Sequence, residues 1–390
     1  MVVAFKNTFL LWFSLSLFCF SYAHTQFQVG ATQIEAYLPL LQNKRIGVVA
    51  HASSLIETSN GSVHLIDSLL AHKIEIVKVF APEHGFRSKA DNGEDFGNSI
   101  DPKTQLPLIS LHGKYKKPQS KDLEGLDLIV FDIQDVGVRF YTYLSSLHLV
   151  MEACAENKVQ VLVLDRPNPN AHYVDGPVME DEFKSFVGMH NVPIVYGLTI
   201  GEYATMINNE GWLKNKIRCE LNVISIKNYT HKTSYSLKVR PSPNLPNDRS
   251  INLYPSLCLL EQTPVSIGRG TEMQFQIYGH PDFKNSGFKF KPKPNFGAKY
   301  PKQNGLLCHG TDLRNQSKLG RVEINWLIDS YKMIQDKEAF FFDSFPRIAG
   351  TKTLQQQIIK GVLEEEIRAS WKPQIDNYLK IRSKYLLYDD

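Results

Sequence analysis

The sequence lacks the cysteine patterns of metal sites and disulfide scaffolds. It has five cysteines in 390 residues, with no Cys-x-x-Cys pair and no Cys/His cluster of zinc spacing. We therefore expect no metal site. Four cysteines lie beyond the first 23 residues, and we expect them to be buried free thiols, although disulfide pairing stays open in an exported protein: Cys154, Cys219, Cys258 and Cys308.

Motifs for nucleotide binding and for a serine nucleophile are also missing. No Gly-x-Gly-x-x-Gly follows the first predicted strand, and the chain contains neither Gly-x-x-x-x-Gly-Lys-Ser/Thr nor Gly-x-Ser-x-Gly. These absences disfavour a nucleotide-dependent enzyme and a serine hydrolase. We expect the protein to work without a cofactor.

An excess of charge of either sign is lacking. Lys and Arg number 44 against 40 Asp and Glu, which gives a formal net charge of +4. A nearly neutral chain predicts no general affinity for nucleic acid or anionic lipid. Two lysine-rich stretches, residues 114–121 and 284–302, are broken by Pro and Gly, and we interpret them as solvated loops rather than polyanion sites.

Long apolar runs are absent except at the start of the chain. Lys6 precedes an apolar run from Thr8 to Phe20, and small residues at Ser21 and Ala23 resemble a cleavage site. The run is shorter than the about 20 residues of a membrane span, so the pattern predicts a secretory signal over residues 1–23. An uncleaved membrane anchor is the alternative. Cleavage leaves 367 residues, which we expect in the periplasm or outside the cell without membrane insertion.

The first half of the chain alternates between strand and helix patterns. Helical spacing occurs at residues 63–72 and 143–157, and short β-branched runs predict buried strands at residues 46–50, 74–80, 126–133 and 159–164. This order predicts an α/β domain over residues 24–195, with a mostly parallel sheet covered by helices on both faces.

The second half is less regular, and we expect a smaller α+β domain over residues 196–390. A capping box at Thr199 predicts a helix start, and the tail over residues 354–385 has a helical pattern. Between them, the Pro-rich segment 240–247 predicts either a linker or a stiff loop that presents Asn244 to a substrate.

Polar residues follow three of the predicted strands. Open parallel sheets bind ligands beyond the carboxyl ends of their strands. Each group alone also fits a helix cap or a turn, but three groups converging on one edge predict a site. They are Glu83 and His84; Asp132, Gln134, Asp135 and Arg139; and Asp165, Arg166 and Asn168.

Several segments, in this order, resemble a family long catalogued as a domain of unknown function and now associated with NamZ-type exo-β-N-acetylmuramidases. Together they lie between residues 80 and 271 of the mature chain, and lysine-rich details are similar to members from Bacteroides-type bacteria. The segments are residues 80–87 (FAPEHGFR), 130–143 (VFDIQDVGVRFYTY), 163–169 (VLDRPNP), 185–188 (SFVG), 197–202 (GLTIGE), 241–246 (PSPNLP) and 268–271 (GRGT).

The resemblance implies a Rossmann-like domain, a smaller second domain and a cleft between them. It also implies an exported glycosidase that removes N-acetylmuramic acid from the non-reducing ends of peptidoglycan glycan fragments, with Glu83 as the catalytic glutamate. Two departures from the family pattern, the turn at residues 51–54 and Tyr196, put the substrate preference in doubt.

Glycoside cleavage needs an acid and, opposite it, a carboxylate or a group of the substrate. Our hypothesis makes Glu83 the general acid, positioned or tuned by His84. The second group is Asp132, Asp135 or the substrate's own 2-acetamido group.

Further residues would bind the substrate. A guanidinium suits the lactyl carboxylate of muramic acid, and a tyrosine ring can stack on a sugar. The candidates are Arg139, Arg166 and Arg269 for the carboxylate, Tyr143 for the ring, and Gln134, Asn168, Asn244 and Thr271 for other contacts. The competing function is an exported binding protein that captures cell-wall fragments without cleaving them.

Overall fold

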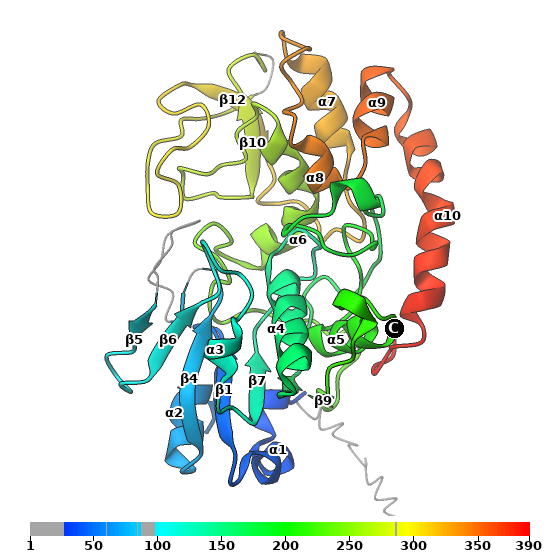
Figure 1. The fold of residues 1–390 in the computed structure, drawn as a ribbon. Helices are drawn as coiled ribbons and strands as arrows, with labels where there is room; N and C mark the ends of the chain where they lie inside the picture. Colours follow the sequence, from blue (N-terminus) through cyan, green and yellow to red (C-terminus); the bar gives the residue numbers. More distant parts are fainter. Residues whose placement is uncertain (1–26, 60, 84, 87–97, 285–286) are drawn as a thin grey trace, which may run out of the picture.

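The computed structural model describes residues 27–59, 61–83, 85–86, 98–284 and 287–390. The predicted signal at residues 1–23 lies outside these ranges, as does His84. Figure 1 shows a sheet domain in the lower part of the view, a smaller domain above it, and α10 running along one side.

A seven-stranded sheet forms the first domain, and all of its neighbouring strands are parallel except β5 and β6. The order across the sheet is β5 (Ser99–Ile100), β6 (Pro107–Ser110), β4 (Glu75–Ala81), β1 (Arg45–Ala50), β7 (Leu128–Asp132), β8 (Gln160–Leu164) and β9 (Leu221–Ile224). The predicted mostly parallel α/β sheet is confirmed.

Helices cover both faces of this sheet, because successive residues of each strand point to opposite sides. Val48 and Val130 pack in one apolar cluster with residues of the first two helices, whereas Val49 and Phe131 pack in another cluster with residues of the next three. These helices are α1 (Ile34–Leu41), α2 (Leu65–Ala71), α3 (Ser120–Leu123), α4 (Tyr143–Asn157) and α5 (Ile200–Asn209).

Two helix predictions differ from the structure in their bounds. Residues 61–64 form β3 (Gly61–His64), which pairs with β2 (Leu55–Thr58), so α2 begins only after this hairpin. The tail predicted as helical is two helices, because Gly361 adopts a left-handed φ of +72° between them.

The smaller domain is α+β, as predicted, and carries the three-stranded antiparallel sheet β10-β12-β11. Its elements are α6 (Asp248–Leu257), β10 (Ile277–His280), β11 (Phe288–Phe290), β12 (Cys308–Asp312), α7 (Asn325–Met333), α8 (Phe345–Ala349), α9 (Thr353–Ile359) and α10 (Glu364–Arg382). Short 3₁₀ turns occur at Gly30–Thr32, Asp181–Phe183, Lys214–Lys216 and Cys258–Gln262.

Both α5 and β9 follow residue 195, where the first domain was predicted to end. The capping box of α5 is as predicted: the Thr199 hydroxyl accepts from the Glu202 N–H, and the Glu202 carboxylate accepts from the Thr199 N–H. β9 pairs with β8, so the sheet draws on residues from both sides of the predicted boundary.

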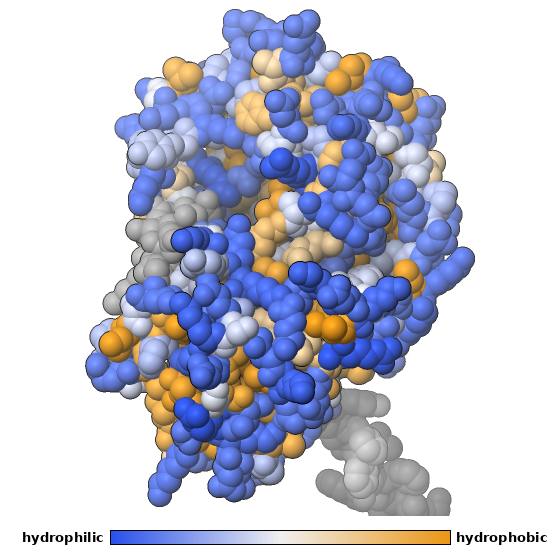
Figure 2. All heavy atoms as spheres, in the orientation of Figure 1, coloured by the Kyte–Doolittle hydropathy of each residue, from blue (hydrophilic) through white to orange (hydrophobic). Residues whose placement is uncertain are grey.

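The four cysteines in the described ranges are buried and unpaired, which confirms the prediction of free thiols. Within those ranges, no helix combines the length and hydrophobicity needed to cross a bilayer. Hydrophilic residues cover most of the face seen in Figure 2, with apolar residues scattered between them.

Candidate active site

The carboxyl ends of four central strands meet at one edge of the sheet. β4 lies on one side of β1 and β7 on the other, so the order in which strands are added changes direction at β1. In open parallel sheets, ligands bind in the crevice at such a point. Residues that follow these strands therefore share this edge: His51 after β1, Glu83 after β4, Gln134 after β7 and Arg166 after β8.

Glu83 is half-buried and has a hydrogen bond to one carboxylate oxygen. The Thr142 hydroxyl donates to Glu83 Oε2 at 2.9 Å, and the Tyr143 hydroxyl donates to the Glu83 backbone oxygen at 3.4 Å. Thr142 is the N-cap residue of α4 but makes no side-chain cap hydrogen bond, so its hydroxyl is available to Glu83. The start of α4 thus orients the carboxyl group that the sequence singled out.

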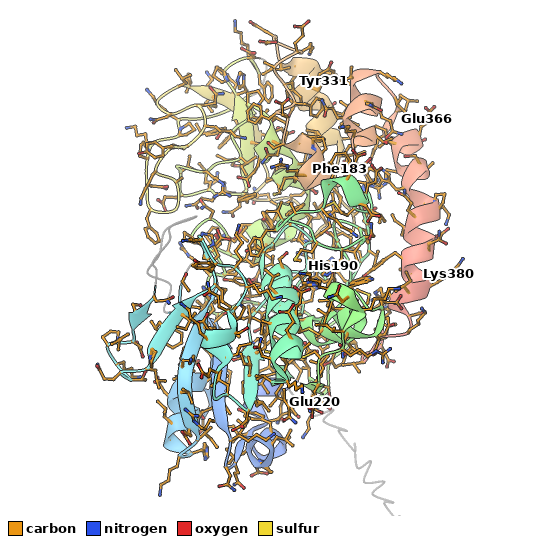
Figure 3. The ribbon with its side chains drawn as sticks, in the orientation of Figure 1. Phe183, His190, Glu220, Tyr331, Glu366 and Lys380 are labelled. Carbon is orange, nitrogen blue, oxygen red and sulfur yellow. The ribbon has the colours of Figure 1, made fainter. Side chains whose placement is uncertain are left out.

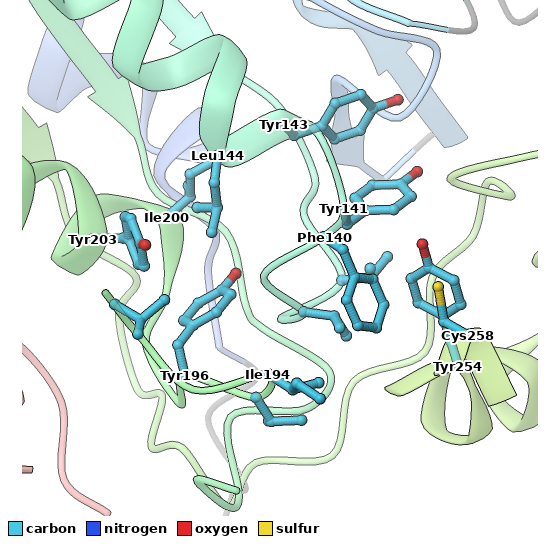
Figure 4. Close-up of a cluster of buried hydrophobic side chains, with 14 of the residues drawn as sticks. Phe140, Tyr141, Tyr143, Leu144, Ile194, Tyr196, Ile200, Tyr203, Tyr254 and Cys258 are labelled. Carbon is cyan, nitrogen blue, oxygen red and sulfur yellow. The ribbon is translucent and has the colours of Figure 1, made fainter. Parts of the chain in front are cut away.

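Three tyrosines extend this cluster toward the Pro-rich segment. The Tyr141 hydroxyl donates to Pro241 O at 2.6 Å, and the Tyr143 hydroxyl lies 3.5 Å from the same oxygen. The rings of Tyr141 and Tyr143 meet edge to face with centroids 4.8 Å apart, and Tyr254 lies 6.1 Å from Tyr141. Figure 4 shows the hydroxyls of Tyr141 and Tyr143 on the same side of the group. The Pro-rich segment therefore reaches the Glu83 cluster.

Two residues of this cluster, Thr142 and His51, were not among the predicted site residues. The His51 ring is buried and lies 5.7 Å from the ring of Tyr143, and its Nδ1 lies 3.3 Å from Ser53 Oγ. Thr142 belongs to the family-like segment 130–143 and His51 to the turn at residues 51–54 that departs from the family pattern, but neither pattern reveals that Thr142 bonds to Glu83 or that His51 lies beside Tyr143.

Asp132 and Arg166 form a buried ion pair with each other. Arg166 Nε and Nη2 donate to the two oxygens of Asp132 at 2.5 and 2.8 Å, and Nη2 also donates to Leu55 O at 3.1 Å. Burial opposes the charge of Arg166, but the Asp132 carboxylate raises the pKa of the guanidinium above its ordinary value. Both Asp132 oxygens are occupied by this pair, which leaves Asp132 poorly placed as the second catalytic carboxylate.

Asp135 is also buried but has one oxygen without a partner in the described part of the chain. Its other oxygen accepts from the Gly137 N–H at 2.6 Å and from the Tyr196 hydroxyl. Burial raises the pKa of Asp135 to about 6, although both donors oppose this shift. Burial also raises the pKa of Tyr143, and the charges of Glu83 and Asp135 add to that shift. The charges of both candidate carboxylates therefore act on the Tyr143 hydroxyl.

A cavity of about 560 Å³ lies beside the ion pair, at the same edge of the sheet. Gln134 lines it and donates through Nε2 to Asp135 O and Pro167 O, while its Oε1 is buried without a partner among the described residues. The other lining residues come from the N-terminal segment, the β1–β2 turn, the β2–β3 hairpin, the loop after β8 and the loop after β9: Phe27, Gln28, Val29, Thr32, Ser53, Leu55, Glu57, Thr58, Ser59, Arg166, Ser234, Tyr235, Ser236, Leu237, Lys238 and Val239.

Arg139 lies away from this edge and does not present its guanidinium to a ligand. Its Nη1 donates to Pro177 O and Val192 O, and its Nη2 donates to Ile348 O and Ala349 O, all at 2.8–2.9 Å. The side chain is buried, and these carbonyls take the place of the predicted lactyl carboxylate.

Asn168 and Thr271 are likewise turned toward the protein's own backbone. Asn168 accepts from the Asn170 N–H and donates to Leu198 O, both at 2.8 Å. The Thr271 hydroxyl donates to Gly268 O at 2.7 Å, which closes the turn in which it lies.

Arg269 and Asn244 both bond to residues of the second half of the chain. Arg269 forms a two-point ion pair with Glu261, at 2.5 and 3.1 Å. Asn244 donates to Gly297 O at 2.7 Å, and its Oδ1 is buried without a partner within the described ranges. The structure thus brings Glu83, Tyr143, Gln134, Asp135 and Arg166 to one edge.

Comparisons with known proteins agree in pointing to one family. The family described as exo-β-N-acetylmuramidase NamZ has an N-terminal model that matches residues 46–249 and a C-terminal model that matches residues 252–388. The peptidoglycan β-N-acetylmuramidase NamZ of Bacillus subtilis (strain 168) is 35% identical over 381 residues, which cover 92% of this chain and 90% of that protein.

Two solved structures share the fold. A crystal structure of a DUF1343 family protein from Bacteroides fragilis NCTC 9343 is 43% identical, with a TM-score of 0.87 over 94% of this chain and 100% of that one. A second DUF1343 family protein from the same organism is 27% identical, with a TM-score of 0.81 over 93% of this chain and 99% of that one.

Proposed function

The chain belongs to the NamZ family of exo-β-N-acetylmuramidases, and from this premise we propose how it acts as a glycosidase on peptidoglycan. It is an exported enzyme that releases N-acetylmuramic acid from the non-reducing ends of glycan fragments, with Glu83 as the catalytic carboxylate. The observation that carries the proposal is the half-buried Glu83 carboxyl at the carboxyl edge, hydrogen-bonded by Thr142.

Glu83 acts as the general acid that protonates the leaving glycosidic oxygen. A carboxyl group suits this task when it is held in one orientation and still reaches the substrate. The Thr142 hydroxyl fixes Oε2, while the half-buried position of the side chain leaves it accessible. His84, which lies outside the described residues, keeps its proposed part in positioning or tuning Glu83.

Asp135 is the proposed second carboxylate, ahead of Asp132. An oxocarbenium-like transition state needs negative charge or a base on the other face of the sugar. Asp135 has an oxygen without a partner in the described part of the chain, whereas Arg166 occupies both oxygens of Asp132. The two-point pair also makes Arg166 chiefly a positioning residue for this edge.

Export rests on residues 1–23 as a secretory signal. We expect the full chain, expressed in a Gram-negative bacterium, to be recovered from the periplasm or medium with His24 as its first residue. Intact-mass spectrometry of the purified protein checks this, and a chain that keeps residues 1–23 would contradict it.

The test of the reaction is release of free N-acetylmuramic acid from a muramic-acid-capped disaccharide and of dye from a chromogenic N-acetylmuraminide. Glu83→Gln should lower release from the disaccharide by about a thousandfold, within the range for loss of a general acid, and release of dye by less, because a dye leaves more readily without a proton. The matched control Glu35→Gln changes an exposed glutamate of α1 and should keep full activity. Full activity of Glu83→Gln would contradict the role of Glu83. A wild-type protein that binds both compounds without cleaving them would contradict the proposed glycosidase activity.

A further inference from the structure

The connection between β11 and β12 is strongly basic and carries exposed aromatic rings. Residues 291–307, which join the two strands, contain four lysines and no aspartate or glutamate. In this segment, Phe296 is 61% exposed and Tyr300 is 95% exposed. We call residues 291–302 the aromatic–lysine loop. Exposed aromatic rings beside cations are a typical composition of binding surfaces.

Backbone contacts hold this loop in place at two points. Asn244 Nδ2 donates to Gly297 O at 2.7 Å, and the Lys293 N–H donates to Gly270 O at 2.8 Å. Gly297 has a φ of +93°, and a Cβ there would lie 2.9 Å from Pro243 Cβ, so only glycine fits. The segments 241–246 and 268–271 thus support the loop, and a surface ordered in advance binds at a lower entropic cost.

The end of the loop is fixed by a half-buried lysine, Lys302. Lys302 Nζ donates to three backbone oxygens, those of Leu260, Glu261 and Thr263, at 3.1, 2.6 and 2.6 Å. Lys302 is therefore structural, whereas Lys291 and Lys293 are exposed.

The loop is connected to the Glu83 cluster through the Pro-rich segment. Pro241 O accepts from Tyr141, and the Tyr143 hydroxyl lies between Pro241 O and the backbone oxygen of Glu83. Three residues further along, Asn244 holds Gly297. Figure 1 shows the loop between β11 and β12 extending from the smaller domain toward the sheet domain.

Acceptor groups beside the loop have no partner in the part of the chain that the structure describes. They are the buried Oδ1 atoms of Asn244 and Asn295, whose amide nitrogens hold Gly297 O and Thr271 O. A cavity of about 480 Å³, lined by Arg269 and Tyr300 among others, adjoins the loop. Hydroxyl and amide N–H groups of a ligand would satisfy such acceptors.

We propose that the aromatic–lysine loop binds the part of the glycan on the leaving-group side of the scissile bond. Sugar rings stack on Phe296 and Tyr300, and the carboxylates of further muramic acid units and their peptides face Lys291 and Lys293. This inference rests on the proposed function, because it assumes that Glu83 cleaves the terminal bond. The loop has no carboxylate of its own that would repel such an anionic chain.

The experiment compares two substrates: a chromogenic N-acetylmuraminide, whose leaving group is not a sugar, and a muramic-acid-capped tetrasaccharide bearing stem peptides. Phe296→Ala/Tyr300→Ala should lower kcat/KM for the tetrasaccharide about tenfold through KM, the size expected of an aromatic contact. Lys291→Gln/Lys293→Gln should weaken the salt dependence of the tetrasaccharide reaction. Both variants should cleave the chromogenic compound at nearly the wild-type rate.

The charge-matched control is Lys360→Gln/Lys380→Gln, which removes two exposed lysines from the α9–α10 side of the molecule. Lys380 points outward from α10 in Figure 3, on the side away from the loop. This control should leave both reactions and their salt dependence unchanged.

Equal losses on both substrates, or no loss on the tetrasaccharide, overturn the proposal. If the wild type cleaves neither substrate, the proposed function fails, and calorimetric titration with the tetrasaccharide still tests the loop. There, about tenfold weaker binding by Phe296→Ala/Tyr300→Ala supports it, and unchanged binding overturns it. Binding to phosphatidylglycerol vesicles that the lysine variant abolishes, with tetrasaccharide binding intact, also overturns it in favour of a membrane surface.

Discussion

Glu83 follows β4 and Asp132 ends β7, the two strands on either side of β1, yet the two carboxylates have opposite surroundings. Glu83 is half-buried and accepts one side-chain hydrogen bond, from Thr142, whereas Asp132 is fully buried and accepts two from Arg166. The Glu83 carboxylate stays accessible to a substrate, whereas both oxygens of Asp132 are bonded to Arg166. An acidic residue after a parallel strand therefore marks the edge, but its partners decide its role.

The largest effect should come from breaking the buried pair. Asp132→Asn leaves Arg166 as a buried charge without a counter-ion, which typically costs about 3–5 kcal/mol of unfolding free energy. Glu83→Gln should change that free energy by less than about 1 kcal/mol, since no buried charge loses its partner. Urea unfolding of both variants measures the difference, and equal stabilities would erase the contrast between the two carboxylates.

The stability of the protein should depend on pH through the buried carboxyl group of Asp135. Its pKa is raised to about 6 in the folded protein from an ordinary 3.8, so the fold binds this proton more tightly than the unfolded chain does. The contribution to stability is full below about pH 4 and is lost as the pH rises through 6, by roughly 3 kcal/mol in total.

The Asp135→Asn variant lacks this titration. Relative to the wild type, its unfolding free energy should rise by roughly 3 kcal/mol between pH 3 and pH 7. Urea unfolding at several pH values checks the trend, with Asp181→Asn at an exposed site as the control. A constant difference between Asp135→Asn and wild type would show that Asp135 is not buried as an acid.

A smaller effect should follow from removing the hydroxyl that holds Glu83. Thr142→Val deletes one hydrogen bond to the carboxyl group and should lower kcat/KM about tenfold with little change in stability. Thr142→Ser keeps the hydroxyl and should restore most of the activity. Assays with the chromogenic N-acetylmuraminide compare the three proteins, and an active Thr142→Val would remove Thr142 from the site.

The smallest effect should come from an ion pair at the rim of the 560 Å³ cavity. Lys238 and Glu57 are paired, but their side chains are 63% and 42% exposed, so water screens the interaction. Glu57→Gln should cost less than about 1 kcal/mol, and less still in high salt. A loss of unfolding free energy as large as that of Asp132→Asn would mean that burial does not make the Asp132–Arg166 pair stronger than the Glu57–Lys238 pair.

The edge of the sheet was predictable from the sequence because strand periods and strand ends are local properties. Buried β-branched runs placed β1, β4, β7 and β8, and parallel pairing brought Glu83, Gln134, Asp135 and Arg166 to the same side. The helix at residues 143–157 was also predicted with the bounds of α4.

The roles of individual side chains were not predictable, because their partners lie far away in the sequence. Arg139 meets carbonyls of residues more than 200 positions later, and Tyr141 meets Pro241 100 positions later. Nothing local distinguishes an arginine that faces a substrate from one that faces backbone carbonyls. Thr142 was missed for the same reason, since only the fold brings it to Glu83.

The contacts of Arg139 have a consequence for how the enzyme moves. One guanidinium ties Pro177 and Val192, which precede the smaller domain, to Ile348 and Ala349 at the end of α8. Gly350 is required there, because a Cβ would lie 2.6 Å from Arg139 Nη2. A hinge motion between the domains would break hydrogen bonds of the buried Arg139 guanidinium and leave its charge without those acceptors. The two domains are therefore coupled, and calorimetry should record their melting as a single cooperative transition.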